Sequence, residues 1–235
     1  MKIIVDAGHG PNTAGKRCPD NSMREYSFNS ATAHYVIEEL QKYDGVEIRT
    51  TFEDSRDVPL NERVSTANSW NADLFVSIHA NASGTGWNNA HGIETFISTD
   101  RESRELRLAK AVHTAIISAT GRVDRGVKEA DFTVIYKTKM PAILVECGFM
   151  TNLEEAKLLK SDSYRRVCAV AIVAGIVNYA GLKRKEGGAE VTKELANEII
   201  PVIQKAWAET KSKAEKDRLH TLANKVRVAS GQKPQ

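Results

Sequence analysis

The stretch Met140-Pro141-Ala142-Ile143-Leu144-Val145-Glu146-Cys147-Gly148 decides the fold class of this chain. Its apolar run, residues 142–146, is short, continuous and bounded by a proline and a glycine. This pattern is typical of a strand buried on both faces. Such strands occur in parallel sheets whose connections are helices. The stretch therefore predicts a buried strand of an α/β protein.

On either side of this stretch, strand patterns alternate with helical patterns over residues 1–182. Hydrophobic periodicity predicts further strands at residues 2–6, 46–51, 73–79 and 92–98 and a short strand at 133–136. It predicts helices at residues 26–43, 60–70, 102–120, 153–160 and 164–180. This order predicts an α/β fold with an open, twisted, mostly parallel sheet and helices on both faces.

The composition changes after residue 182. Residues 183–189 are polar and predict a linker between a domain over 1–182 and a small all-helical C-terminal domain over 190–235. Pro201 predicts a kink or a new helix start within the tail. About 45 residues are too few to bury a stable core, so we expect the tail to self-associate, to pack on the main domain or to bind a large partner.

The composition of the 235 residues, with 41% hydrophobic and 27% charged residues, is that of a globular protein. No window approaches the roughly 18 uninterrupted apolar residues of a membrane span. Residues 1–10 lack the pattern of a signal peptide, so we expect synthesis in the cytoplasm. Cys18, Cys147 and Cys168 form no CxxC pair and are expected to be reduced thiols.

Polar side chains stand where three of the predicted strands end. His9 follows the first strand within Asp6-Ala7-Gly8-His9-Gly10, His79 ends the third, and Glu146 ends the dense apolar strand. Because the carboxyl ends of parallel strands meet at one edge of a sheet, we expect these groups to lie together. Glu25, at the start of the first helix, is a fourth candidate. Two histidines and a carboxylate with an open fourth position form a catalytic rather than a structural zinc site, and the remaining carboxylate would act as a base.

Each of these residues also has a simpler interpretation. Gly-His-Gly forms tight turns, His79 suits a hydrogen-bonded structural histidine, and Glu25 suits a solvated helix start, where the helix dipole favours acidic residues. Glu146 is harder to explain in this way, because a carboxylate that closes an apolar strand must be paired, protonated or metal-bound. The coincidence of all four at one sheet edge favours a site.

Four motifs carry a resemblance to a known family. They are residues 6–10, Glu25 followed by Phe28 and Asn29, residues 63–81, and residues 140–152. In this order and spacing, over roughly residues 1–182, the chain resembles the zinc-dependent N-acetylmuramoyl-L-alanine amidases. That family cleaves the amide between the lactyl group of N-acetylmuramic acid and the first L-alanine of the peptidoglycan stem peptide.

The resemblance implies roles for individual residues. It assigns zinc binding to His9, Glu25 and His79 and the catalytic carboxylate to Glu146. Asn29 and Asn81 are candidates for substrate contacts or for orienting the ligands, and either residue would also suit a helix cap or a loop. Arg63 is a candidate partner for stem-peptide carboxylates, or an ion-pair partner of a neighbouring acid. Cys147 is assigned no chemistry.

The resemblance leaves the biological setting open. A phage or prophage endolysin is the first expectation, acting on the cell wall after release, and a mother-cell lytic or autolytic amidase of a spore former is the second. A peptidoglycan-binding module without turnover and a zinc peptidase of ordinary peptides are further alternatives.

The tail holds the basic charge of the chain. The whole chain has a formal net charge of +3, and residues 183–235 contain 12 Lys and Arg against 7 Asp and Glu. The larger domain is therefore slightly acidic, and we expect no nucleic-acid partner for it. The tail has two interpretations: attraction to anionic wall polymers with Trp207 stacking on sugars, or a helical pair in which Trp207 packs.

Overall fold

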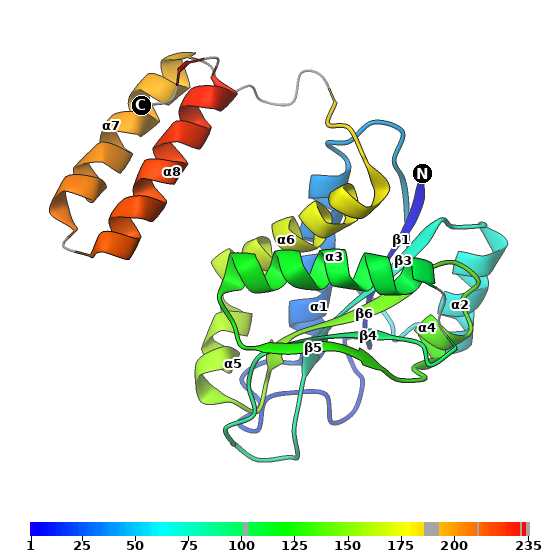
Figure 1. Cartoon of the computed structure of the whole chain (residues 1–235). Helices are drawn as coiled ribbons and strands as arrows, with labels where there is room; N and C mark the ends of the chain where they lie inside the picture. Colours follow the sequence, from blue (N-terminus) through cyan, green and yellow to red (C-terminus); the bar gives the residue numbers. More distant parts are fainter. Residues whose placement is uncertain (101–102, 186–192, 211, 231, 234–235) are drawn as a thin grey trace. The chain divides into compact units, whose positions relative to one another are not determined.

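The computed structural model describes residues 1–100, 103–185, 193–210, 212–230 and 232–233 (Figure 1). The chain divides into two compact units, Met1–Arg184 and Lys185–Gln235. Residues 186–189 of the predicted linker and the first residues of the predicted helical domain, 190–192, lie outside the described residues.

The first unit is built on one six-stranded sheet with the strand order β2-β1-β3-β6-β4-β5. The strands are β1 (Lys2–Ala7), β2 (Glu47–Thr50), β3 (Leu74–Asn81), β4 (Ile93–Ile97), β5 (Asp124–Glu129) and β6 (Ala142–Phe149). Neighbouring strands are parallel except β4 and β6, which are antiparallel. The predicted open and mostly parallel sheet is confirmed.

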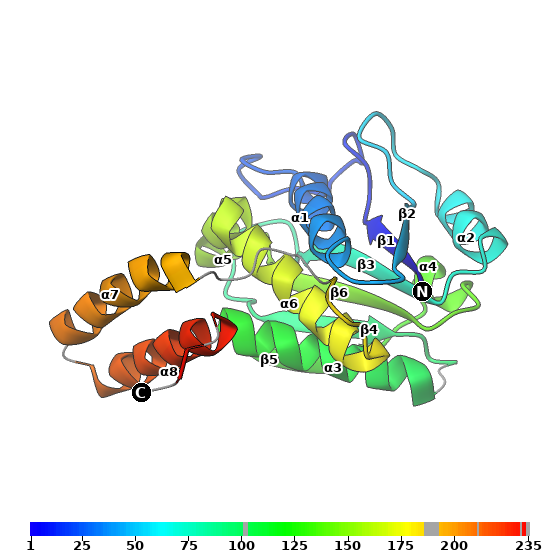
Figure 2. The same ribbon diagram turned by 90° about the horizontal axis from the view of Figure 1, so that it is seen from above.

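Helices cover both faces of this sheet (Figure 2). The helices are α1 (Glu25–Leu40), α2 (Leu60–Ser69), α3 (Ser103–Thr120), α4 (Thr133–Tyr136), α5 (Leu153–Lys160) and α6 (Asp162–Ala180). Helix α6 packs against α1, α3 and α5, whereas α2 packs against α4. Side chains alternate between two cores, so Ile3 and Val5 enter the larger one and Ile4 the smaller one beneath α2 and α4.

Helices α3 and α6 approach each other closely because Gly175 has no side chain. A Cβ atom at Gly175 would lie 2.4 Å from the Cα atom of Val112. The contact brings the backbones of the two helices together over the larger core.

Two elements near the end of the sheet differ from the sequence prediction. Residues 133–136, predicted as a strand, form the single-turn helix α4, in which Val134 and Ile135 enter the smaller core. Strand β5 was not predicted, because it lies at the sheet edge and its sequence, DRGVKE, has no apolar alternation.

The second unit contains two helices, α7 (Lys193–Glu209) and α8 (Lys213–Ala229), which pack against each other. Pro201 lies inside α7, so the predicted new helix start at this residue is wrong. Proline at this position removes one backbone hydrogen bond, and packing of Ile200, Ile203 and Ala223 in the buried interior of the unit offsets the loss. Within the described parts of the chain, no helix is long and apolar enough to span a bilayer.

Candidate metal centre

The strand ends of the sheet place several polar side chains on the face that carries the smaller core. Asp6 alternates with Ile4 on β1, Ser77 and His79 follow Phe75 on β3, and Glu146 follows Leu144 on β6. His79 and Glu146 are direct register partners across β3 and β6. Parallel pairing therefore brings together residues that lie 67 positions apart in the sequence.

His9 reaches the site through a tight turn after β1. The backbone of His9 has a φ of 63°, which is unusual for a residue with a side chain. Gly8 lies directly beneath the His79 ring, and a Cβ atom at Gly8 would be 1.9 Å from Cε1 of that ring. Glycine is therefore required between Ala7 and His9 if His79 is to keep its place.

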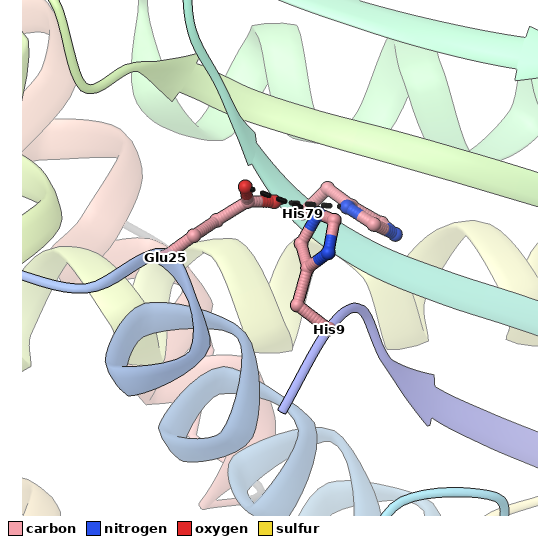
Figure 3. Close-up of side chains that lie close together, drawn as sticks. All are labelled: His9, Glu25 and His79. Atoms are coloured by element: carbon pink, nitrogen blue, oxygen red, sulfur yellow. Dashed lines mark hydrogen bonds and ion pairs between the residues drawn. The ribbon is translucent and has the colours of Figure 1, made fainter. Parts of the chain in front are cut away.

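Glu25 joins the two histidines (Figure 3). Its Oε2 lies 3.2 Å from Nε2 of His9 and its Oε1 lies 2.9 Å from Nδ1 of His79. Burial alone would raise the pKa of Glu25, but the hydrogen bonds from His79 and His9 outweigh burial and hold the pKa well below its usual range. The carboxylate is therefore ionised and faces both rings.

A second layer of hydrogen bonds orients His79. Its Nε2 lies 3.1 Å from Oγ of Ser77, and Ser77 donates to Asp6 at 2.5 Å. The contact with Ser77 occupies Nε2 of His79, and Nδ1 of His79 faces Glu25. Metal-binding histidines are commonly held in this way by a polar partner on the other ring nitrogen.

The three side chains fit a metal ion. One ligand atom each from His9, Glu25 and His79 lies within 4.8 Å of the others. Two imidazoles and one carboxylate are the donor set of catalytic zinc sites that keep one position open. The grouping predicted from the sequence is present.

Glu146 lies beside this group with a free carboxylate oxygen. Its Oε2 is buried and has no hydrogen-bond partner among the described residues. Burial raises the pKa of Glu146 well above its usual value, and the neighbouring charges of Glu25 and Glu94 raise it further. An unpaired buried carboxylate is costly, which points to a functional rather than a structural role.

A cavity of about 730 Å³ opens in front of these residues. Its lining includes the side chains of the candidate metal-binding group, which are His9, Glu25 and His79, together with Glu146, Asn81 and Lys16. Residues 57–60 and residues 131–134 also line the cavity and supply the apolar side chains of Leu60 and Phe132, which are 52% and 41% exposed. The volume suits an extended ligand rather than a single small ion.

Arg63 is not available to a substrate. Its side chain is 1% exposed, and its five N–H groups donate to the backbone carbonyls of Val58, Ala7 and His9 and to the carboxylates of Asp6 and Asp57. The predicted contact with stem-peptide carboxylates is therefore not supported, because no donor remains. The alternative, an ion pair with a neighbouring acid, matches the structure, and Arg63 fixes the turn that carries His9.

The two candidate asparagines lie in different places. Asn29 is fully buried, and its Nδ2 donates to Gly8 at 2.9 Å and to Glu25 at 3.3 Å, so it orients a ligand instead of contacting substrate. Asn81 lines the cavity and remains a candidate for a substrate contact. Cys147 is buried within the core, as are Cys18 and Cys168.

Sequence reasoning did not identify Ser77, Glu94 or the supporting role of Asp6. Each has a signal in the sequence, because each is a polar residue within an otherwise apolar strand pattern. Such residues must be hydrogen-bonded when buried, and all three are buried here. Their partners lie on other strands, which the sequence does not reveal.

Comparison with known proteins agrees with this geometry. A family model described as N-acetylmuramoyl-L-alanine amidase matches residues 3–178. The chain is 35% identical to the endolysin of Bacillus phage SPP1, over 82% of this chain and 70% of the relative. It is 31% identical to the sporulation-specific N-acetylmuramoyl-L-alanine amidase of Bacillus subtilis, over 78% of this chain and 70% of the relative.

A solved structure shows the same fold. The N-acetylmuramoyl-L-alanine amidase from Clostridium difficile 630 superimposes with a TM-score of 0.74 at 32% identity, covering 77% of this chain and 97% of that one.

Proposed function

The chain belongs to the N-acetylmuramoyl-L-alanine amidase family, and from this premise we propose that it uses a zinc ion held by His9, Glu25 and His79. The bond it cleaves is the amide between the lactyl group of N-acetylmuramic acid and the L-alanine of the peptidoglycan stem peptide. The observation that carries the proposal is the free oxygen of Glu146 beside a two-histidine, one-carboxylate group.

Zinc is the ion that suits this donor set. The site offers two nitrogen atoms and one carboxylate, and Ser77 backs one of the histidines. When bound there, zinc would supply Lewis-acid chemistry, which lowers the pKa of water to about 7 and polarises an amide carbonyl. With one anionic ligand, the site would keep a net positive charge.

Glu146 moves the proton in this proposal. Its carboxylate accepts a proton from the attacking water, and the resulting carboxyl group donates that proton to the alanine nitrogen as the amide bond breaks. Burial raises the pKa of Glu146, which makes its carboxylate a stronger base than an exposed glutamate. Leu60 and Phe132 supply apolar walls that reduce the access of bulk water to the cavity.

Product analysis on purified peptidoglycan tests this function. The amidase reaction releases stem peptides with free N-terminal alanine and creates no new reducing sugar ends. New reducing ends, or N-termini other than alanine, would contradict it, and the latter would identify a zinc peptidase. Binding to peptidoglycan without any release would identify a non-catalytic module.

The biological setting that we propose is lysis by a phage or prophage endolysin acting on the cell wall. Similarity to the endolysin of phage SPP1 supports this setting, and similarity to the sporulation amidase supports the second candidate, a lytic enzyme of a spore former. Deleting the gene separates them: loss of host lysis after prophage induction fits the endolysin, whereas spores retained inside mother cells fit the second candidate.

A further inference from the structure

A second buried carboxylate lies directly beside Glu146. Glu94 on β4 is the register partner of Glu146 on β6, and the two strands are antiparallel. Both side chains therefore leave the sheet on the same face, with Cβ atoms about 5 Å apart. Glu94 is only 4% exposed. Like charges in this arrangement destabilise a sheet unless something compensates them.

Arg125 and Lys128 compensate the charge of Glu94 through direct contacts. Nε of Arg125 donates to Oε1 of Glu94, and Nζ of Lys128 donates to the same oxygen at 2.9 Å. These contacts hold the pKa of Glu94 below its usual value, although burial opposes them. By contrast, Glu146 keeps a free oxygen, as described above.

A β-bulge in β5 brings both cations to the same carboxylate. Residues 125 and 128 would face opposite sides of a regular strand, because side chains alternate. Between β4 and β5, however, Ile93 pairs with Asp124 and Thr95 with Val127, so β5 carries one extra residue. Gly126, with a φ of 85°, lies in this bulge. Bulges re-aim side chains in this way and are frequent next to active sites.

The cations lie within reach of the strand that carries Glu146. The guanidinium of Arg125 is 4.8 Å from the ring centroid of Phe149, which is also on β6. Arg125 therefore already extends across β4 to β6. Glu94 also faces the cavity side, because Nδ2 of Asn81 lies 3.4 Å from its Oε2.

We propose that Glu94 is a positioning residue that holds Arg125 and Lys128 away from Glu146 and so keeps the catalytic carboxylate unpaired. This inference rests on the proposed function, because it concerns the base of that reaction. With Glu94 neutralised, the two cations lose their carboxylate partner, and Glu146 is the neighbouring buried carboxylate with an unpaired oxygen. A cation on Glu146 would pair with the carboxylate that must accept the proton and lower its basicity.

The test uses three variants of the full chain: Glu94→Gln, the double variant Arg125→Gln/Lys128→Gln, and the triple variant that combines them. Turnover is measured on a soluble disaccharide-tetrapeptide fragment of peptidoglycan, together with bound zinc and the thermal midpoint. For Glu94→Gln we expect kcat to fall about 100-fold, within the range of a disabled general base. KM stays within about threefold and zinc stays stoichiometric, because the metal ligands and the substrate walls are untouched.

The triple variant separates positioning from a structural role. Removing the two cations as well should restore kcat at least about tenfold over Glu94→Gln, whereas independent structural losses would add up and give no recovery. The double variant leaves Glu94 without its cations beside Glu146, so its thermal midpoint should fall. The triple variant carries neither the cations nor the Glu94 charge and should keep kcat within about tenfold of wild type. The triple variant remains informative if Glu94→Gln fails to fold, because a loss of kcat as large as about 100-fold in the triple variant would overturn the inference.

Wild-type turnover is measured first. Its absence would overturn the proposed function and this inference with it. An active wild type together with unimpaired Glu94→Gln, or with a triple variant no faster than Glu94→Gln, would overturn this inference alone.

Discussion

Gly8 and His9 show how the backbone, as much as ligand chemistry, builds the metal centre. His9 adopts a left-handed backbone conformation, and Arg63 holds its carbonyl oxygen at 2.5 Å. Gly8 leaves room for the ring of His79. The sequence predicted which side chains would meet, because strand ends converge at one sheet edge. It did not predict the roles of Arg63 and Asn29, whose partners include backbone atoms of distant segments.

Substituting Gly8 tests the close approach at this turn. Gly8→Ala should push the His79 ring out of place and weaken zinc binding about 10- to 100-fold, the usual cost of disturbing the support of a ligand. Gly86→Ala is the matched control, because nothing lies within 4 Å of a Cβ atom there. Zinc affinity measured by competition with a chelator checks the prediction, and equal affinity in the two variants would contradict it.

Removing one predicted ligand tests the assignment of the metal. His79→Ala should lose most bound zinc in elemental analysis, because only two ligands remain. His34→Ala, an exposed histidine of α1 whose side chain is 53% exposed, should keep it. Stoichiometric zinc in His79→Ala would disprove the ligand assignment.

At the scale of elements, a buried ion pair ties α2 to the ends of β1 and β3. Asp6 on β1 accepts from Arg63 of α2 at 2.7 Å and also from Ser77 of β3. Both charged side chains are 1% exposed. Removing either Arg63 or Asp6 would therefore leave the other as an unpaired buried charge and lower the free energy of unfolding.

Arg63→Met should lower the free energy of unfolding by about 3–5 kcal/mol, because Asp6 would be left as an uncompensated buried charge. Arg56→Met is the control: this arginine pairs with Glu53 and Glu62 at the surface, where ion pairs add little. Urea unfolding of both variants provides the measurement. Similar midpoints would show that the buried pair does not stabilise the fold.

The elements that sequence patterns missed are those whose conformation depends on neighbours. Residues 133–136, TVIY, have strand propensity but form α4, because one helical turn places Val134 and Ile135 in the smaller core. Strand β5 forms by pairing with β4, and its bulge is a feature of that pairing, so neither has a signal in the local sequence. By contrast, β6 and β3 were predictable because nearly all their side chains are buried.

At the scale of the whole molecule, the charge of the chain separates with its two units. The predicted boundary at residue 182 lies close to the division after Arg184, and the tail carries the excess of basic residues. In the tail, Trp207 is 44% exposed and Lys216 lies 4.6 Å from its ring centroid. Wall targeting and self-association through the tail remain predictions.

Deleting residues 185–235 tests the division of labour. The shortened chain should fold and turn over a soluble muropeptide within about twofold of the full chain, because domains with their own core act independently. Binding to intact sacculi should fall if basic tail residues meet anionic wall polymers. Unchanged sacculus binding would rule out wall targeting, and sedimentation of both forms would report self-association.

The most direct test of the whole account is one comparison on Glu146→Gln: bound zinc per chain and turnover of a soluble muropeptide. We expect as much zinc as in wild type, because His9, Glu25 and His79 are intact, and turnover lower by a factor of about 100 to 10,000. Near-normal turnover, or loss of the zinc, would contradict the separation of metal ligands from the proton-transferring carboxylate on which the proposed mechanism depends.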